Sequence, residues 1–222
     1  TDSLGRIKVQ FHWDLEGQRN EQSSCWMRVL HSWGGAGWGT QFIPRIGMEV
    51  MVSFVYGDQD APLVIGSVYN GTHPFPFNVP GDKTRSGIRT QSSLGGDGFN
   101  ELSFEDARSA EQIFLHAQRD LDEVVERDHT LRVGRDETMA IGRHQSLHVG
   151  GDQTERIDGN RRERIGIDHT ARVDGNRETS VGQDETLRVE GNRYTVSTND
   201  DQVVTENLTT RVGGRERREV VG

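Results

Sequence analysis

The chain has 222 residues and a formal net charge of −9, and hydrophobic residues make up only 32% of it. That fraction is low for a compact fold of this length, so most of the chain cannot be ordinary core. The acidic balance argues against phosphate-backbone binding, and the lone Cys25 excludes an internal disulfide and cysteine metal clusters. The sequence also has no apolar run of membrane length and no signal peptide.

Residues 1–72 predict a small β domain. Residues 7–13 alternate apolar and polar side chains, as a half-buried strand does. Further strands are expected at 25–30, 48–54 and 62–69. About five short strands in roughly 70 residues, separated by Gly, Pro and Asp turns, are typical of a small closed barrel of the OB type.

Other features of this domain have structural interpretations. The tryptophans, which all lie at or before Trp38, are expected to fill the core rather than to stack nucleic-acid bases. Cys25 is expected to be a buried thiol rather than a nucleophile. The glycine-rich loop 34–39 lacks the Lys-Ser/Thr ending and the helix of a phosphate-binding loop, so we predict no cofactor.

Residues 73–116 predict a connector with some structure of its own. Its prolines, Pro74, Pro76 and Pro80, forbid a continuous helix and favour extended chain. Two short alternating runs, 100–105 and 112–117, flank the segment 106–111. They predict a hairpin or paired strands.

From residue 117 to residue 222 the chain follows an eight-residue repeat, here called the octad. An aliphatic residue returns at every eighth position, and Gly, Asp or Glu usually follows it, where glycine permits a bend. Such fixed-period self-similarity predicts stacked units. The aliphatic row consists of Val125, Val133, Ile141, Val149, Ile157, Ile165, Val173, Val181 and Val189, followed by Val196, Val204, Val212 and Val220.

The residue two places before each aliphatic shares its side of the strand, and these residues form the companion row. The row reads Leu131, Met139, Leu147, Glu155, Glu163, Ala171, Thr179, Leu187 and Thr195. One octad therefore buries about two apolar side chains, worth roughly 3 to 6 kcal/mol. Ordering its backbone costs about 8 to 16 kcal/mol, so a lone strand cannot form. Periodicity leaves open whether one chain coils on itself or several wind together.

A family resemblance rests on motifs that occur in order along nearly the whole chain. They are GRIKVQFHWD, PRIGMEVMVSFVYGDQDAPLVIGSVYNG, TRSGIRTQSS, GGDGFNELSFED and EQIFLHAQRDL, followed by the valine-glycine octads. This order resembles VgrG, the valine-glycine repeat family at the tip of the type VI secretion system. The resemblance implies an all-β fold, with an OB domain and then a homotrimeric, triple-stranded β-helix similar to contractile-phage spikes.

The resemblance also implies a mechanical function. A trimeric spike would be driven through a target membrane and would deliver effectors, with the tube protein, a PAAR-type tip protein and adaptors as partners. It would assemble in the cytoplasm and leave through the type VI system, and it would not be an enzyme. Two alternatives are a phage-type tail spike with lysozyme activity and a phage or adhesin fibre shaft.

In such a trimer the aliphatic row is expected to line the axis. Glu155 and Glu163 would then form two rings of carboxylates, neutralised by Arg156 and Arg164, by raised pKa values or by a bound cation. The alternative is that they swing outward or meet enclosed water. We expect Arg161 on the outer surface, where alanine should do little.

The remaining expectations concern the histidines and the spacing of the row. His129 and His169 are expected on the outer surface, and His144 and His148 lie about 13 Å apart along a strand, too far for one metal ion. Val196 follows Val189 by seven residues instead of eight, which reverses strand facing and predicts a local change between 193 and 199.

Overall fold

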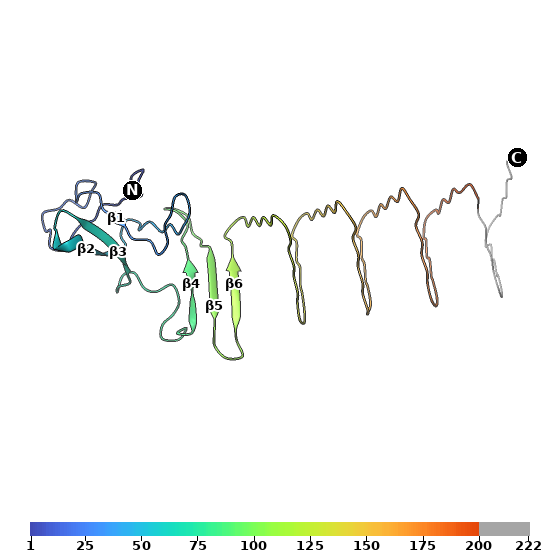
Figure 1. Cartoon of the computed structure of the whole chain (residues 1–222). Coiled ribbons are helices and arrows are strands. Elements are labelled where there is room, and N and C mark those ends of the chain that lie inside the picture. Colours follow the sequence, from blue (N-terminus) through green and yellow to red (C-terminus); the bar gives the residue numbers. More distant parts are fainter. Residues whose placement is uncertain (200–222) are drawn as a thin grey trace. The chain divides into compact units, whose positions relative to one another are not determined.

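The computed structural model describes residues 1–199. They fold as two compact units, Thr1–Thr138 and a second unit that begins at Met139. Apart from one short 3-10 turn, η1 (Val55–Gly57), the regular elements described are all strands, which confirms the all-β prediction (Figure 1). The domain boundaries after residues 72 and 116 stay predictions.

The first sheet holds three strands in the order β1 (Arg28–Val29), β3 (Pro62–Val68) and β2 (Glu49–Phe54). The strands β2 and β3 are antiparallel, with an irregularity between Met51 and Val52, whereas β1 runs parallel to β3. The alternating runs at 48–54 and 62–69 therefore form the strands that their pattern predicts.

The core of this sheet is small. Ile7, Met27 and Val64 are its buried side chains, and half-buried apolar residues such as Val9 and Phe11 pack around them. Only Ile7 of the predicted strand at 7–13 makes a bridge, to Met27. The alternation thus predicts the core positions of Ile7, Val9 and Phe11 but not the exposed Trp13, and the segment forms no strand of its own.

Two predictions about the core are wrong. All four tryptophans are 40–70% exposed, and Cys25 is exposed as well. Trp38 packs instead on its own loop, edge to face with Trp33 at 5.1 Å between ring centroids. A Cβ at Gly35 would lie 2.3 Å from Trp38 Cε2, so this glycine is where the indole approaches the backbone closely. The loop is a short hairpin, closed by an antiparallel bridge between Gly34 and Gly39.

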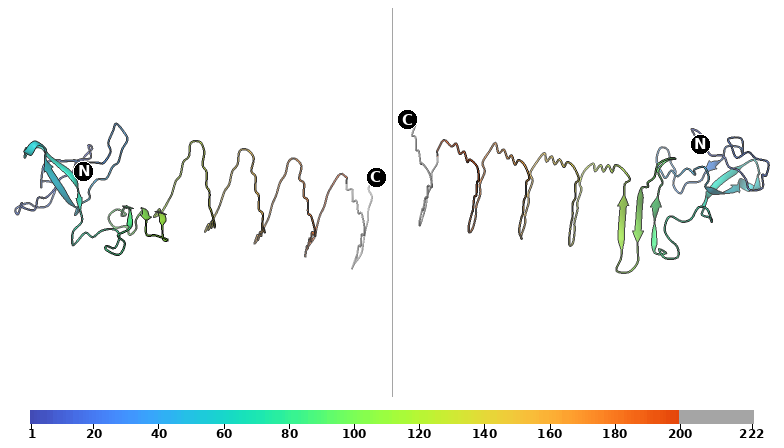
Figure 2. Two further views of the ribbon diagram at one scale, coloured as in Figure 1. Left: turned by 60° about the horizontal axis from the view of Figure 1, so that its bottom comes forward. Right: turned by 180° about the vertical axis from the view of Figure 1, so that it is seen from behind.

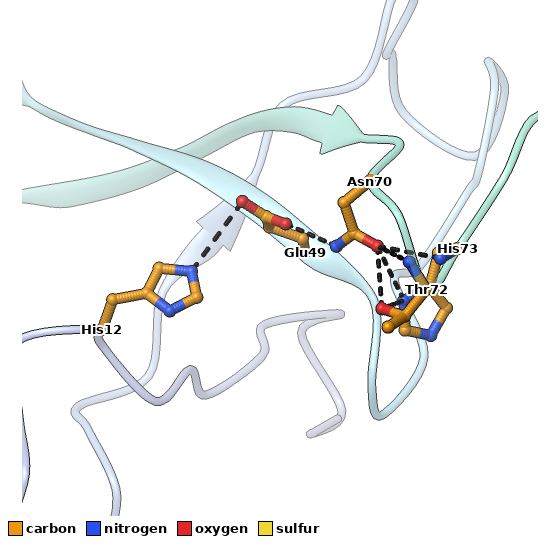
Figure 3. A network of polar contacts seen from close by, with 5 residues as sticks. All are labelled: His12, Glu49, Asn70, Thr72 and His73. Carbon is orange, nitrogen blue, oxygen red and sulfur yellow. Dashed lines mark hydrogen bonds and ion pairs between the residues drawn. The ribbon is translucent and has the colours of Figure 1, made fainter.

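A polar network fixes the turn that follows β3 (Figure 3). The side-chain carbonyl of Asn70 accepts hydrogen bonds from the backbone N–H groups of Thr72 and His73, at 3.0 and 2.8 Å. Its amide donates to Glu49 Oε2 at 2.5 Å, and His12 Nε2 lies 3.8 Å from Glu49 Oε1. Asn70 therefore closes the turn and ties it to β2.

The second sheet is an antiparallel meander of β4 (Arg85–Arg89), β5 (Glu101–Glu105) and β6 (Gln112–His116). The pair β5 and β6 confirms the predicted hairpin. The strand β4 is not predicted by the sequence pattern, because its five residues contain only one large apolar side chain, Ile88. Gly87 lets the two backbones meet, because a Cβ there would lie 2.5 Å from Leu102 O.

Beyond β6 the described chain contains no strand, and its backbone is punctuated by bends (Figures 1 and 2). The bends fall on the two residues after each aliphatic, from 126–127 after Val125 to 190–191 after Val189. The eight-residue spacing of the bends confirms the predicted position of the turn in each octad.

Candidate interface on the second sheet and the octad tail

The second sheet buries its polar side and exposes its apolar side. On β5, Glu101 and Ser103 are only 7% and 3% exposed. The opposite side carries large apolar residues that are all 39–72% exposed, and we call this set the apolar face: Ile88, Leu102, Phe104, Ile113 and Leu115. An apolar sheet face open to water is typical of a surface that another chain covers.

The buried polar side is organised around Glu101. Ser103 Oγ donates to Glu101 Oε1 at 2.6 Å, and Arg89 Nε lies 3.8 Å from Glu101 Oε2. The Arg89 guanidinium stacks 3.7 Å from the Phe99 ring centroid, and this ring lies 4.5 Å from that of His116. The paired carboxylate and the stacked rings thus give Glu101 and Ser103 polar or aromatic neighbours within one chain.

The octad tail is not satisfied within one chain. Residues 118–199 are all exposed, and between 119 and 199 the structure gives no hydrogen bond to a backbone N–H or C=O group. An ordered extended chain without such bonds has nothing to offset its loss of conformational entropy. Residues 1–199 of the same chain therefore supply no partner for this stretch of backbone.

The aliphatic row shares one environment along the tail. Its members from Val125 to Val189 are 42–53% exposed, while the apolar companions Leu131, Met139, Leu147 and Leu187 are 62–72% exposed. Val196 differs, at 98% exposed. Val204, Val212 and Val220 lie outside the described residues.

The exposure of Val196 follows from its spacing. The bend at 198 comes eight residues after the bend at 190, so the backbone keeps its period where the sequence loses one residue. The octad position that continues from Val189 is Ser197, and Val196 takes the opposite facing.

Glu155 and Glu163 meet a single arginine. Arg161 Nη1 lies 3.0 Å from Glu155 Oε2, and Arg161 Nη2 lies 3.8 Å from Glu163 Oε2. The outer placement expected for Arg161 is therefore wrong, because four residues before Ile165 is an even spacing and shares its side. Arg156, expected beside the glutamates, pairs instead with Asp158 at 2.9 Å.

Exposed ion pairs decorate the other side of the tail. Three of them join residues on either side of an aliphatic and recur every sixteen residues: Arg156 with Asp158, Arg172 with Asp174, and Arg188 with Glu190, at 2.8–2.9 Å. All six side chains are at least 79% exposed, so each pair contributes only about 0.2–1 kcal/mol.

Neither a metal-ion cluster nor a membrane-spanning helix occurs among residues 1–199. Within residues 1–199, no three His, Cys, Asp or Glu side chains gather closely enough to hold a metal ion. In the same range, no helix has the length and apolarity to cross a bilayer. The exposed apolar face and the octads without backbone partners are therefore the candidate interaction surfaces of the described residues.

Comparison with known proteins agrees with this architecture. Residues 1–69 match the type VI secretion system/phage-baseplate injector OB domain. The chain is 56% identical over 133 residues to the type VI secretion system spike protein VgrG4b of Pseudomonas aeruginosa, and 50% identical over 136 residues to VgrG1a of the same species. It is 49% identical over 129 residues to VgrG3 of Vibrio cholerae.

These matches confirm the resemblance to VgrG and define its extent. They cover 58–60% of this chain but only 13–21% of the three relatives. Residues 86–196, half of the chain and the part that holds nearly all of the second sheet and the described octads, match a further family. The chain therefore belongs to the family of the bacteriophage T4 gp5 C-terminal trimerisation domain.

Proposed function

We propose that three copies of this chain wind together into a rigid shaft that serves as the cell-puncturing spike of a type VI secretion system. The observation that carries the proposal is the octad tail up to residue 199, in which the aliphatic row and the backbone both lack partners among the described residues of the chain. Three chains would bury the row along a common axis and pair the backbone groups between neighbours.

The proposed action is mechanical. The tail would form the shaft, the OB head would join it to the rest of the spike, and a contractile sheath would push the assembly through a target membrane to deliver effectors. The names of the relatives, which are spike proteins of this secretion system, support the proposal. The work comes from the sheath, so the shaft needs stiffness and no catalytic group.

The proposed partners are the tube protein, a PAAR-type tip protein, and effectors with their adaptors. The protein would assemble in the cytoplasm and leave through the type VI machinery. Pull-down of purified tube protein and of a PAAR-type protein by the 222-residue chain tests these contacts separately. A trimer that captures neither would favour a phage or adhesin fibre.

The first test of the proposal is the mass in solution. Light scattering should give about 75 kDa, three times the 24.9 kDa of one chain. A mass near that of one chain would remove the shaft and with it the function. Peptidoglycan turnover by the purified trimer would instead favour the tail-lysozyme class.

A further inference from the structure

Repetition creates a problem of alignment for any shaft built from this tail. Aliphatic residues recur every eight positions from Val125 to Val189, so chains displaced by one octad would still stack aliphatic on aliphatic. Apolar packing alone distinguishes such states poorly. Alignment of the chains therefore needs a feature that is not repeated, either within the tail or in the domains that precede it.

The structure shows where such features can act. Side chains six residues apart meet across the bend. The first lies two places before one residue of the aliphatic row, and the second lies four places before the next residue of that row. Three contacts of this kind are Glu123 Oε1 with His129 Nε2 at 3.6 Å, Met139 Sδ with Gln145 Nε2 at 3.5 Å, and Glu155 Oε2 with Arg161 Nη1 at 3.0 Å. His129 thus lies beside the companion side and not on the outer surface as expected.

Arg161 differs from the other residues in these contacts because it reaches two successive members of the companion row. Its guanidinium also reaches Glu163, the next member of the companion row. Between Leu131 and Thr195 that row contains no acidic residue other than these two glutamates. The three side chains are 51–62% exposed in one chain, and they stand beside the aliphatic row that the shaft would bury.

We infer that Glu155, Arg161 and Glu163 form a polar register lock that aligns this chain with two further copies of itself. The inference rests on the trimeric shaft proposed above. In the aligned state the three polar clusters share one level, where each charge meets other polar groups. Single polar layers fix register in other coiled assemblies by the same principle.

Displacement of one chain by one octad breaks this match. A glutamate of the aligned chains then faces Leu147 or Ala171 of the displaced one, in place of another polar group. The pairs within each chain move with that chain, so their charges stay neutralised. One glutamate then lies level with an apolar side chain, however, and desolvation of an ion pair against apolar side chains is unfavourable.

Distances between spin labels in the full 222-residue chain test the lock. Cys25→Ser removes the native thiol, and Thr170→Cys places one label on the outer side of each chain. The chain with the native lock should give a single set of distances between labels. The triple variant Glu155→Leu, Arg161→Leu and Glu163→Leu should remain a trimer by light scattering and show additional distances from displaced chains.

A matched control replaces an outer ion pair instead. Arg172→Leu with Asp174→Leu removes two charges from the exposed side and should leave one set of distances. The lock is refuted if the triple variant keeps a single set, because the head or the second sheet would then fix the alignment. Loss of the trimer in the triple variant also refutes it, since the lock aligns the chains and does not drive their association.

Non-additivity gives a second and independent readout. Arg161→Leu alone leaves two carboxylates per chain without their arginine, so the trimer should dissociate at a lower temperature than the native protein. Adding Glu155→Leu and Glu163→Leu should restore the dissociation temperature of the trimer, because no unpaired carboxylate is then left. Failure of this rescue counts against the lock, whereas a single-chain mass for the unaltered protein would contradict the proposed trimer itself.

Discussion

Individual carboxylates of the second sheet show how a charge is held at a strand surface. Glu105 accepts hydrogen bonds from the Thr84 hydroxyl and from the backbone N–H of Ala107, and Arg85 Nε lies 3.5 Å from it. These contacts, the Thr84 hydroxyl foremost, hold the pKa of Glu105 below its ordinary value of 4.5. The depressed pKa stabilises the sheet above pH 4.5, and this contribution is lost as pH falls through the folded-state pKa.

Thr84→Val should raise the pKa of Glu105 toward its ordinary value, because it removes the hydroxyl donor but keeps the side-chain shape. A carboxyl-carbon NMR titration of the native protein and the variant measures the change. The stability of the variant should also depend less on pH below pH 4.5. An unchanged titration midpoint would show that the backbone donor and Arg85 hold the carboxylate without the hydroxyl.

At the scale of elements, close backbone approach decides where the second sheet can form. β4 carries little hydrophobic alternation, and it pairs with β5 because Gly87 admits the backbone of Leu102 and Ser103. The resulting meander presents the apolar face on one side and the Glu101 cluster on the other.

Gly87→Val should destabilise the second sheet by about 1–3 kcal/mol, because its side chain would collide with a neighbouring strand. Chemical denaturation followed by the signal of a label on β5 measures the loss. Gly71→Val is the matched control, since a Cβ there meets nothing within 4 Å. Equal losses in the two variants would contradict the close approach at Gly87.

Prediction from sequence succeeds where a local pattern determines the element. Alternation predicts β2 and the β5–β6 hairpin, an apolar run predicts β3, and the octad predicts the described bends from residue 126 to residue 191 but not the bend at 198, which ignores the shift to Val196. It misses β4, whose position depends on a partner strand, and it misplaces the tryptophans, because three buried side chains leave little core for them. Arg161 is misassigned for a simpler reason, since an even spacing from Ile165 places it on the companion side.

At the scale of the whole molecule, the proposed trimer depends on which side of the tail faces the axis. In the proposed trimer the half-exposed aliphatic row would face the axis, and the exposed arginine-acid pairs would lie on the outer side. The same substitution on the two sides should therefore have very different effects.

Ile157→Asp should convert a heat- or SDS-resistant trimer to single chains, because it places three carboxylates at one level of the axis. Thr170→Asp adds the same group to the outer side and should leave the trimer intact. Gel mobility without boiling and light scattering report both outcomes. Comparable loss in the two variants would overturn the assigned facing.

The effect of Val196→Asp on the trimer should be closer to that of Thr170→Asp than to that of Ile157→Asp, although Val196 belongs to the valine pattern. Its side chain is 98% exposed because the bend period continues through Ser197. The melting temperature of the trimer compares the two variants. A loss as large as that of Ile157→Asp would show that Val196 returns to the axis on assembly.

The absence of backbone partners along residues 119–199 has a consequence for a newly made copy. Extended, unpaired chain is the form that proteases bind and cut, so a copy that has not met its partners exposes a long cleavable segment. Encounter of three copies becomes steeply slower as their concentration falls. A copy that waits longer for its partners is therefore exposed to cleavage for longer, so proteolysis of the unassembled chain should rise as its concentration falls.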